Sequence, residues 1–79
     1  MMTAGQLRAA RALLGIDQKT LAGMSGVSLP TIQRMEASDG TVRGNVDTLT
    51  KIIEALDRAG IQLLSTGGRG VLLRELPQQ

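Results

Sequence analysis

The sequence predicts a mainly α-helical domain of four short helices followed by a β-hairpin. Three observations predict this class: capping residues precede four segments of helical length, apolar residues recur in them at helical spacing, and the chain then changes to two short apolar runs around a glycine-rich turn. A chain of 79 residues forms one domain at most and buries only about 60% of its unfolded surface. We therefore expect it to gain stability from a partner subunit.

The composition excludes several classes of site. The chain has no Cys, His, Trp, Tyr or Phe, so disulfide bonds and the usual soft-metal sites are excluded and the core must be aliphatic. We expect no metal and no cofactor. No hydroxyl has a His to activate it and no carboxylate has an evident pocket partner, so we expect no catalytic residue and no enzyme activity. The net charge of +2 is weak evidence for a nucleic-acid partner when taken alone.

The chain lacks the patterns of membrane insertion and export. No apolar run approaches the ~18 residues that span a membrane, and the first residues lack the charged and then apolar layout of a signal peptide. We expect a cytoplasmic protein with no membrane partner.

The first helix is predicted over residues 4–14. Thr3 and Gln6 have the spacing of a capping box, and apolar residues and alanines follow at helical spacing. Gly15 suits the left-handed position just past a helix end.

Two further short helices are predicted in the middle of the chain. Asp17 can cap a helix over residues 18–24, and Ser28 can cap another over 29–36, with Pro30 in its first turn, where a missing amide hydrogen costs little. In this third helix Ile32 and Met35 face inward, and the outer face is polar with one long cation. The outward residues are Thr31, Gln33 and Arg34.

The fourth helix is predicted to start after its cap, Asn45, and to end near residues 59–60. Its apolar stripe is predicted from helical spacing, and core packing is a better interpretation of it than any ligand pocket. The stripe comprises Val46, Leu49, Ile52, Ile53 and Leu56.

The end of the chain is predicted to form a β-hairpin. Residues 61–65 and 71–75 are its strands and residues 66–70 its turn. We interpret residues 1–60 as the helical domain and residues 61–79 as a dimerisation element, because apolar side chains on both faces of an isolated hairpin need two surfaces to cover them. Helix four can cover one face, and a second copy of the chain the other face or an edge. This predicts a homodimer.

The second and third helices have the spacing of a helix-turn-helix. Such a pair needs a small side chain where the helices cross and a glycine where the chain reverses, which Ala22 and Gly26 supply. Apolar residues must also fill the wedge between the helices, and Val27, Ile32 and Met35 can do so.

From Leu7 to Leu56 the sequence resembles the Xre/Cro-repressor type of helix-turn-helix. The resemblance is carried by small, apolar and polar positions at fixed offsets. They are Gly15-Ile16-Asp17-Gln18, Leu21-Ala22, Gly26-Val27-Ser28, Thr31-Ile32 and Met35-Glu36. It implies a lambda-repressor-like four-helix DNA-binding domain whose third helix enters the major groove of double-stranded DNA.

The resemblance also implies roles for individual residues. Leu29, Pro30, Thr31 and Arg34 occupy the base-facing positions, and Gln18, Lys19, Ser28, Arg43 and Asn45 would hold the DNA backbone. Arg34 is the candidate for sequence discrimination, because an Arg fork can donate two hydrogen bonds to guanine, which is worth about 1–3 kcal/mol. Leu29-Pro30 departs from the polar residues that many relatives carry, so readout would depend more on Arg34, apolar contact and DNA shape.

The family pairs the positions of Arg11 and Glu36 in an ion pair between the first and third helices. Its role would be structural, and removing one partner would cost about 3–5 kcal/mol if the other charge is trapped inside.

Other features have simpler interpretations. Gly67-Gly68-Arg69-Gly70 lacks the ending of a phosphate loop and reads as a turn. Outside a helix-turn-helix, we would interpret Arg34 and Arg43 as solvated cations, and four further cations are expected on the solvated surface away from the DNA face. These are Lys51, Arg58, Arg69 and Arg74.

The function predicted is a transcriptional regulator, a repressor that binds an inverted-repeat operator as a dimer. Two alternatives remain open. In the first, the protein is an antitoxin that represses its own operon and also binds a toxin protein. In the second, it is a protein-interaction module whose third helix contacts a protein instead of DNA. The dependence of binding on salt concentration separates DNA from a protein partner.

Overall fold

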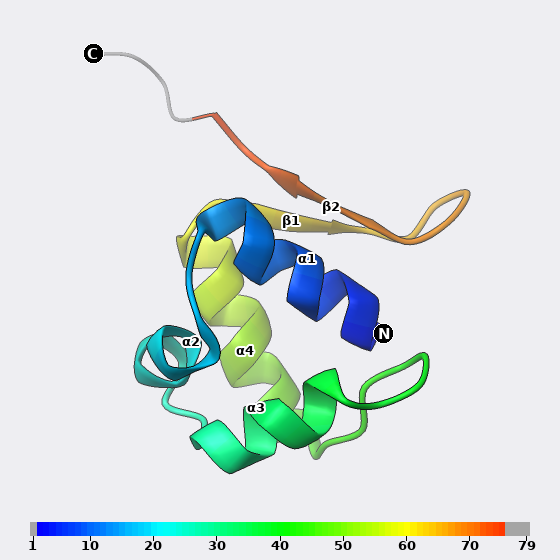
Figure 1. Cartoon of the computed structure of the whole chain (residues 1–79). Helices are drawn as coiled ribbons and strands as arrows, with labels where there is room; N and C mark the ends of the chain where they lie inside the picture. Colours follow the sequence, from blue (N-terminus) through cyan, green and yellow to red (C-terminus); the bar gives the residue numbers. More distant parts are fainter. Residues whose placement is uncertain (1, 76–79) are drawn as a thin grey trace.

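The computed structural model describes residues 2–75 and shows four helices covered on one side by a hairpin (Figure 1). The helices are α1 (Ala4–Leu14), α2 (Gln18–Ser25), α3 (Leu29–Glu36) and α4 (Val46–Arg58), and the strands are β1 (Ile61–Leu64) and β2 (Gly70–Leu73). The hairpin and α3 lie on opposite sides of the molecule. Within residues 2–75, no helix has the length and apolarity needed to cross a membrane. The predicted class, four helices and a C-terminal hairpin, is confirmed.

Each helix begins at a side chain that accepts a hydrogen bond from a backbone amide of the first turn. Such caps satisfy donors that have no partner within the helix. The caps are the four predicted ones, Thr3, Asp17, Ser28 and Asn45. Thr3 and Gln6 form the full capping box. The caps explain why the observed helix starts agree with those predicted.

The turn between α2 and α3 depends on Gly26. Its φ of 75° lies in the left-handed region, where a side chain would be strained, and its amide donates to the carbonyl of Ala22 at 2.9 Å. This bond closes α2 and sends the chain into α3.

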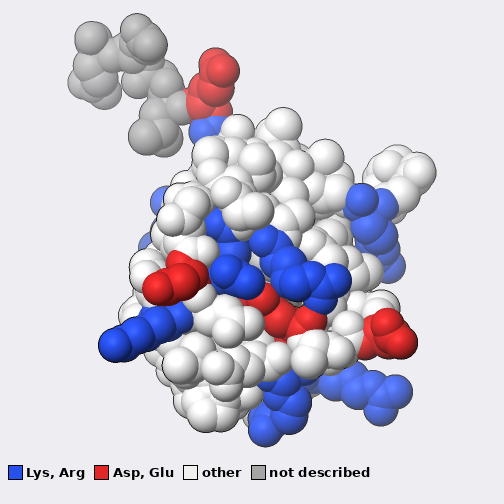
Figure 2. All heavy atoms as spheres, viewed as in Figure 1, with Lys and Arg blue, Asp and Glu red and all other residues white. Residues whose placement is uncertain are grey.

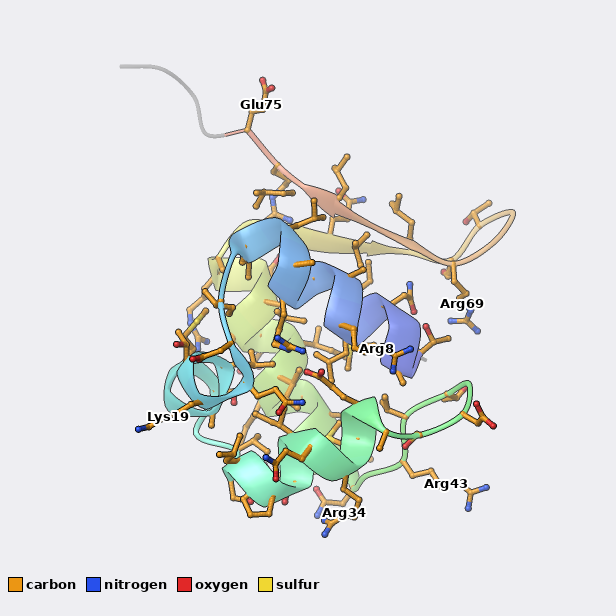
Figure 3. The ribbon with its side chains drawn as sticks, in the orientation of Figure 1. Arg8, Lys19, Arg34, Arg43, Arg69 and Glu75 are labelled. Atoms are coloured by element: carbon orange, nitrogen blue, oxygen red, sulfur yellow. The ribbon has the colours of Figure 1, made fainter. Side chains whose placement is uncertain are left out.

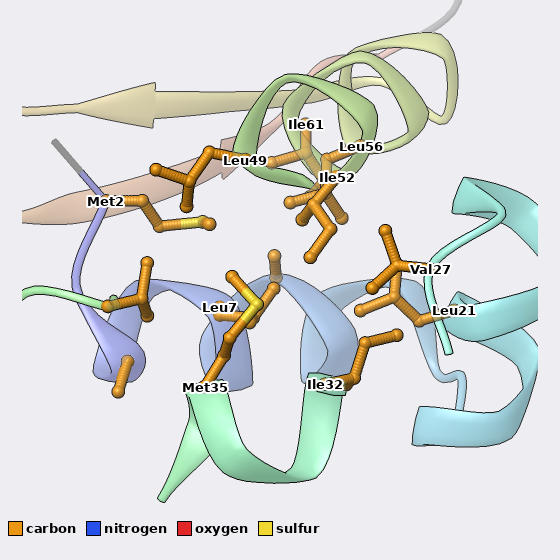
Figure 4. Packing of buried hydrophobic residues seen from close by; sticks show 13 residues of the cluster. Met2, Leu7, Leu21, Val27, Ile32, Met35, Leu49, Ile52, Leu56 and Ile61 are labelled. Carbon is orange, nitrogen blue, oxygen red and sulfur yellow. The ribbon is translucent and has the colours of Figure 1, made fainter. Parts of the chain in front are cut away.

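A single aliphatic core joins all four helices and the hairpin (Figure 4). Its largest fully buried side chains come from each helix, so each helix is anchored to the others. They are Leu7, Leu21, Ile32, Met35, Ile52 and Leu56. Ile61 of β1 belongs to the same core, with Leu63 and Val71 packed against it.

Two members of the predicted α4 stripe are not in the core. Val46 is 80% exposed and Ile53 is 40% exposed, whereas Leu49, Ile52 and Leu56 are buried as predicted. Val46 is the first residue of α4, and the buried side of the helix is turned away from both positions, toward Ala55, which is 1% exposed.

The hairpin packs across α1 and α4, a wider surface than α4 alone. Its strands are antiparallel, with Ile61 opposite Leu73 and Leu63 opposite Val71 on the inner face. Gln6, which is buried, donates through Nε2 to the carbonyls of Leu64 at 2.8 Å and Gly70 at 2.9 Å. The same side chain accepts from Thr3 N at 2.9 Å, so one residue caps α1 and fixes the turn end of the hairpin.

Candidate nucleic-acid interface

The outer face of α3 is the centre of the candidate interface. Ile32 and Met35 are buried and hold α3 against the core, while Pro30, Gln33 and Arg34 are exposed on its other side. Two further residues of this helix, Leu29 and Thr31, are half-buried. The structure therefore presents a short polar helix whose exposed side carries one arginine.

A network of hydrogen bonds around Glu36 holds the end of α3. Arg11 donates to both carboxylate oxygens of Glu36 at 2.6 Å, and Gln18 Nε2 donates to Oε1 at 3.1 Å. Arg11 also donates to the carbonyl of Ile16 at 3.2 Å, and Arg8 donates to the backbone carbonyl of Glu36. The network thus ties α1, the linker after it, the start of α2 and the end of α3 into one unit.

The ion pair between Arg11 and Glu36 is largely shielded from water. The Glu36 side chain is 3% exposed and that of Arg11 is 21% exposed. Hydrogen bonds from Arg11 to Glu36 raise the pKa of Arg11 above its ordinary value, so this guanidinium stays charged. A bidentate pair also fixes the orientation of both side chains. The direction in which α3 points is therefore set by α1.

Three predicted cations surround α3 without a carboxylate partner. Lys19, Arg34 and Arg43 are exposed, and among the described residues none of them forms an ion pair. Figure 3 shows them spread along the side of the molecule that α3 occupies, and Figure 2 shows basic side chains distributed over this face. Uncompensated cations of this kind attract a polyanion.

The start of α2 can donate hydrogen bonds to an anion, but it also carries a negative charge. The first intrahelical bond runs from Leu21 N to Asp17 O, so the amides of Gln18 and Lys19 precede it. Asp17 accepts from Thr20 N at 2.7 Å. The hydrogen bonds from Thr20 hold the pKa of Asp17 below its usual value of 3.8, so its carboxylate is ionised beside these two amides.

Three residues expected at the DNA backbone already have partners within the chain. Gln18 faces Glu36, as described above. Ser28 donates to Thr31 Oγ1 at 2.8 Å, and Asn45 Oδ1 accepts from Thr48 N at 2.7 Å. Ser28 and Asn45 are exposed, so the DNA contact expected of each would be added to its capping role.

Replacing Asp17 tests how much of the α2 cap depends on charge. Since the folded-state pKa of Asp17 is lowered, its ionised form stabilises the fold above pH 3.8 and this contribution is lost as the pH falls through the folded value. Asp17→Asn keeps an acceptor for Thr20 but removes the charge. We expect wild type to be more stable than Asp17→Asn at pH 7, and the difference to vanish as the pH falls below the folded-state pKa of Asp17, in urea unfolding followed by far-UV circular dichroism.

Asp17→Ala is the matched control, because it removes the acceptor as well and should be less stable than Asp17→Asn at every pH. A difference between wild type and Asp17→Asn that stays constant over this range would contradict the argument.

Sequence analysis missed two residues that shape this region. Arg8 lies three residues before Arg11 on the same side of α1, a spacing that could have indicated a shared target. Gln6 is predicted as part of a cap, but no local signal indicates its hydrogen bonds to Leu64 and Gly70, which lie 58 and 64 positions further along the chain.

Comparison with known proteins agrees with this geometry. A helix-turn-helix family model matches residues 7–59, which is more than half of the chain and includes most of α1 and all of α2, α3 and α4. Among curated proteins, none matches the chain.

Proposed function

The chain belongs to the helix-turn-helix family of the Xre/Cro type, and we propose that this DNA-binding transcriptional regulator is a repressor that binds an inverted-repeat operator as a homodimer. The observation that carries the proposal is the outer face of α3, where Arg34 is exposed on a helix that the Arg11–Glu36 pair holds in place. The family is a DNA-binding regulatory family and not an enzyme family.

In this proposal α3 lies in the major groove and Arg34 reads a guanine. A guanidinium can donate two hydrogen bonds to O6 and N7 of guanine. Leu29 and Pro30 offer apolar contact, which suits a thymine methyl group, and Thr31 can contact a base in either way. The Thr31 hydroxyl oxygen already accepts a hydrogen bond from the Ser28 hydroxyl, which leaves its own hydrogen to donate to a base.

The DNA backbone would be held on both sides of α3. Lys19 at the start of α2 and Arg43 in the loop after α3 supply charge, and the amides of Gln18 and Lys19 supply hydrogen bonds. Ser28 and Asn45 complete the set of backbone contacts that we propose.

A two-fold dimer must direct both α3 helices toward the same DNA. The hairpin lies opposite α3 (Figure 1), so two copies stacked through the outer face of the hairpin would direct their α3 helices apart. The surface that we propose for the dimer is a groove of about 490 Å³ between α4 and β1. Four apolar residues line it, Ile53, Leu56, Ile61 and Leu63, together with the polar or charged Glu54, Asp57, Arg58, Gln62 and Arg74. The partly exposed Ile53 would then be covered, and β1 of the hairpin would belong to the interface.

Selection from random duplexes tests the proposal. The purified protein is titrated against the pool at two salt concentrations, and retained duplexes are sequenced. We expect an enriched inverted repeat, and a dimer that neutralises about six phosphates should show a log-log slope of affinity against salt near −5. Arg34→Ala should lose about 1–3 kcal/mol of discrimination per half-site at one base position.

Lys51→Ala is the control, because it removes an exposed cation of α4 that is paired with Asp47 and lies outside the proposed interface. It should leave the enriched sequence unchanged. Retention without enrichment would exclude a specific operator, and no retention at low salt would exclude the DNA function and favour a protein partner.

A further inference from the structure

The turn of the hairpin carries an arginine on the side of the molecule that faces the start of α1. Residues 65–69 form this turn and extend past the helices (Figure 1). Figure 3 shows Arg69 at the same end of the molecule as Arg8 and Arg43. The sequence alone predicts Arg69 among the solvated cations away from the DNA face.

A shared pocket and one backbone hydrogen bond show that this turn, the start of α1 and the loop after α3 are close together. Arg69 lines a small pocket of about 210 Å³ together with Met2 and Gln6. The carbonyl of Met2 accepts from Val42 N at 3.0 Å, and Val42 precedes Arg43. The hairpin turn, the start of α1 and the loop after α3 are therefore neighbours.

The turn is held in position on α1. Gln6 donates to the carbonyls of Leu64 and Gly70, the two residues that face each other at the start of the turn. Because Gln6 also forms the α1 capping box, the turn is fixed to the helix that orients α3. A cation at this position is placed relative to the interface and does not depend on a flexible linker.

The turn itself leaves room for a close approach. Gly67 has a φ of 76°, and a side chain built at Gly67 or Gly68 would meet no atom within 4 Å. Both positions open onto free space, so the backbone of the turn can come near a rigid anionic surface without a side chain between them.

We infer that the hairpin turn is an additional contact for the DNA backbone, in which Arg69 binds a phosphate beyond those reached from α3 and its flanking loops. Arg8 and Arg43 lie at the same end of the molecule as Arg69 (Figure 3), and Figure 2 shows an acidic side chain between the basic ones there. This inference rests on the proposed DNA function and adds a second, separate element to its interface. The ligand is the phosphodiester backbone of duplex DNA, so the contact adds affinity without sequence discrimination.

The test compares Arg69→Gln with Lys51→Gln, which removes one positive charge from an exposed residue of α4 outside the proposed DNA and dimer surfaces. Each protein is titrated against a mixed-sequence 30-bp duplex over a range of salt concentrations, after circular dichroism has shown matching helix content and melting. We expect Arg69→Gln to weaken binding about tenfold per protomer at 0.1 M salt and to make the log-log slope shallower by about 0.9 per protomer. Arg69→Lys should retain most of the slope.

The outcomes separate this inference from the proposed function. Equal slopes for Arg69→Gln and Lys51→Gln, with steep salt dependence in wild type, would overturn the hairpin contact and leave the DNA function intact. A wild-type protein without salt-dependent binding would overturn both. A shallower slope for Arg69→Gln alone, restored by Arg69→Lys, supports the contact.

Discussion

Replacing Arg11 by Met is expected to destabilise the protein by about 3–5 kcal/mol, because it leaves the carboxylate of Glu36 buried without its counter-charge. The Glu36 side chain is 3% exposed, so water cannot take over the role of the guanidinium. A chain of 79 residues has a total stability of roughly 4–12 kcal/mol, so this loss is a large part of it. The melting temperature should fall by at least about 12 °C.

The converse variant is the matched control. In Glu36→Gln the group left behind is Arg11, whose side chain is 21% exposed and can reach water. We therefore expect a smaller loss than in Arg11→Met. The double variant Arg11→Met with Glu36→Met should recover much of the stability, since replacing both partners of a buried pair by apolar groups is often neutral.

Urea unfolding followed by far-UV circular dichroism at fixed protein concentration measures all three variants, because the chain has no aromatic residue to report by fluorescence. A loss below about 1 kcal/mol, the range of surface pairs, would show that the pair does not hold α3.

The helices and their order could be predicted because their signals are local. Thr3, Asp17, Ser28 and Asn45 each cap a helix through an amide three residues ahead. A cap of this kind depends only on the residue types within one turn, which the sequence displays directly. The ion pair of Arg11 and Glu36 is different, since its expectation came from the family resemblance and the structure places the two side chains in contact.

The error in the α4 stripe has a geometric cause. Successive residues of a helix are rotated by about 100°, so Val46 and Ile53 lie roughly 90–110° from the middle of the buried stripe of Leu49, Ile52, Ala55 and Leu56. The prediction used only large apolar residues, which placed the stripe too close to Ile53. Ala55 lies on the buried side of α4, but the prediction left it out because its side chain is small.

The placement of the hairpin could not be predicted, because it depends on contacts between distant residues. Gln6 bonds to Leu64 and Gly70, and β2 packs on α1. Residue types in residues 61–75 indicate strands but carry no information about which helix they cover. The position of Arg69 near Met2 and Gln6 at the start of α1 follows from that packing, and no local signal in the sequence indicates it.

Shortening Ile32 to Ala is expected to destabilise the protein by about 2–5 kcal/mol, because it leaves a cavity between α3 and the core. Ile32 is 0% exposed and projects from α3 into the cluster that includes Leu21 and Val27 (Figure 4). Ile32→Val should cost only about 0.5–1.5 kcal/mol. The same urea titration measures the series, and a cost for Ile32→Ala no larger than that for Ile32→Val would contradict the packing.

Gln33, the next residue of α3, supplies the control. It separates the loss of buried packing from the mere shortening of a side chain on this helix. Gln33 is exposed on the same helix, so Gln33→Ala should change stability by less than about 0.5 kcal/mol. Ile32→Ala should also weaken DNA binding at temperatures where it remains folded, because Ile32 orients α3 together with Met35 and the Glu36 network. Unchanged affinity in a folded Ile32→Ala protein would mean that Met35 and the Glu36 network are sufficient to position the outer face of α3.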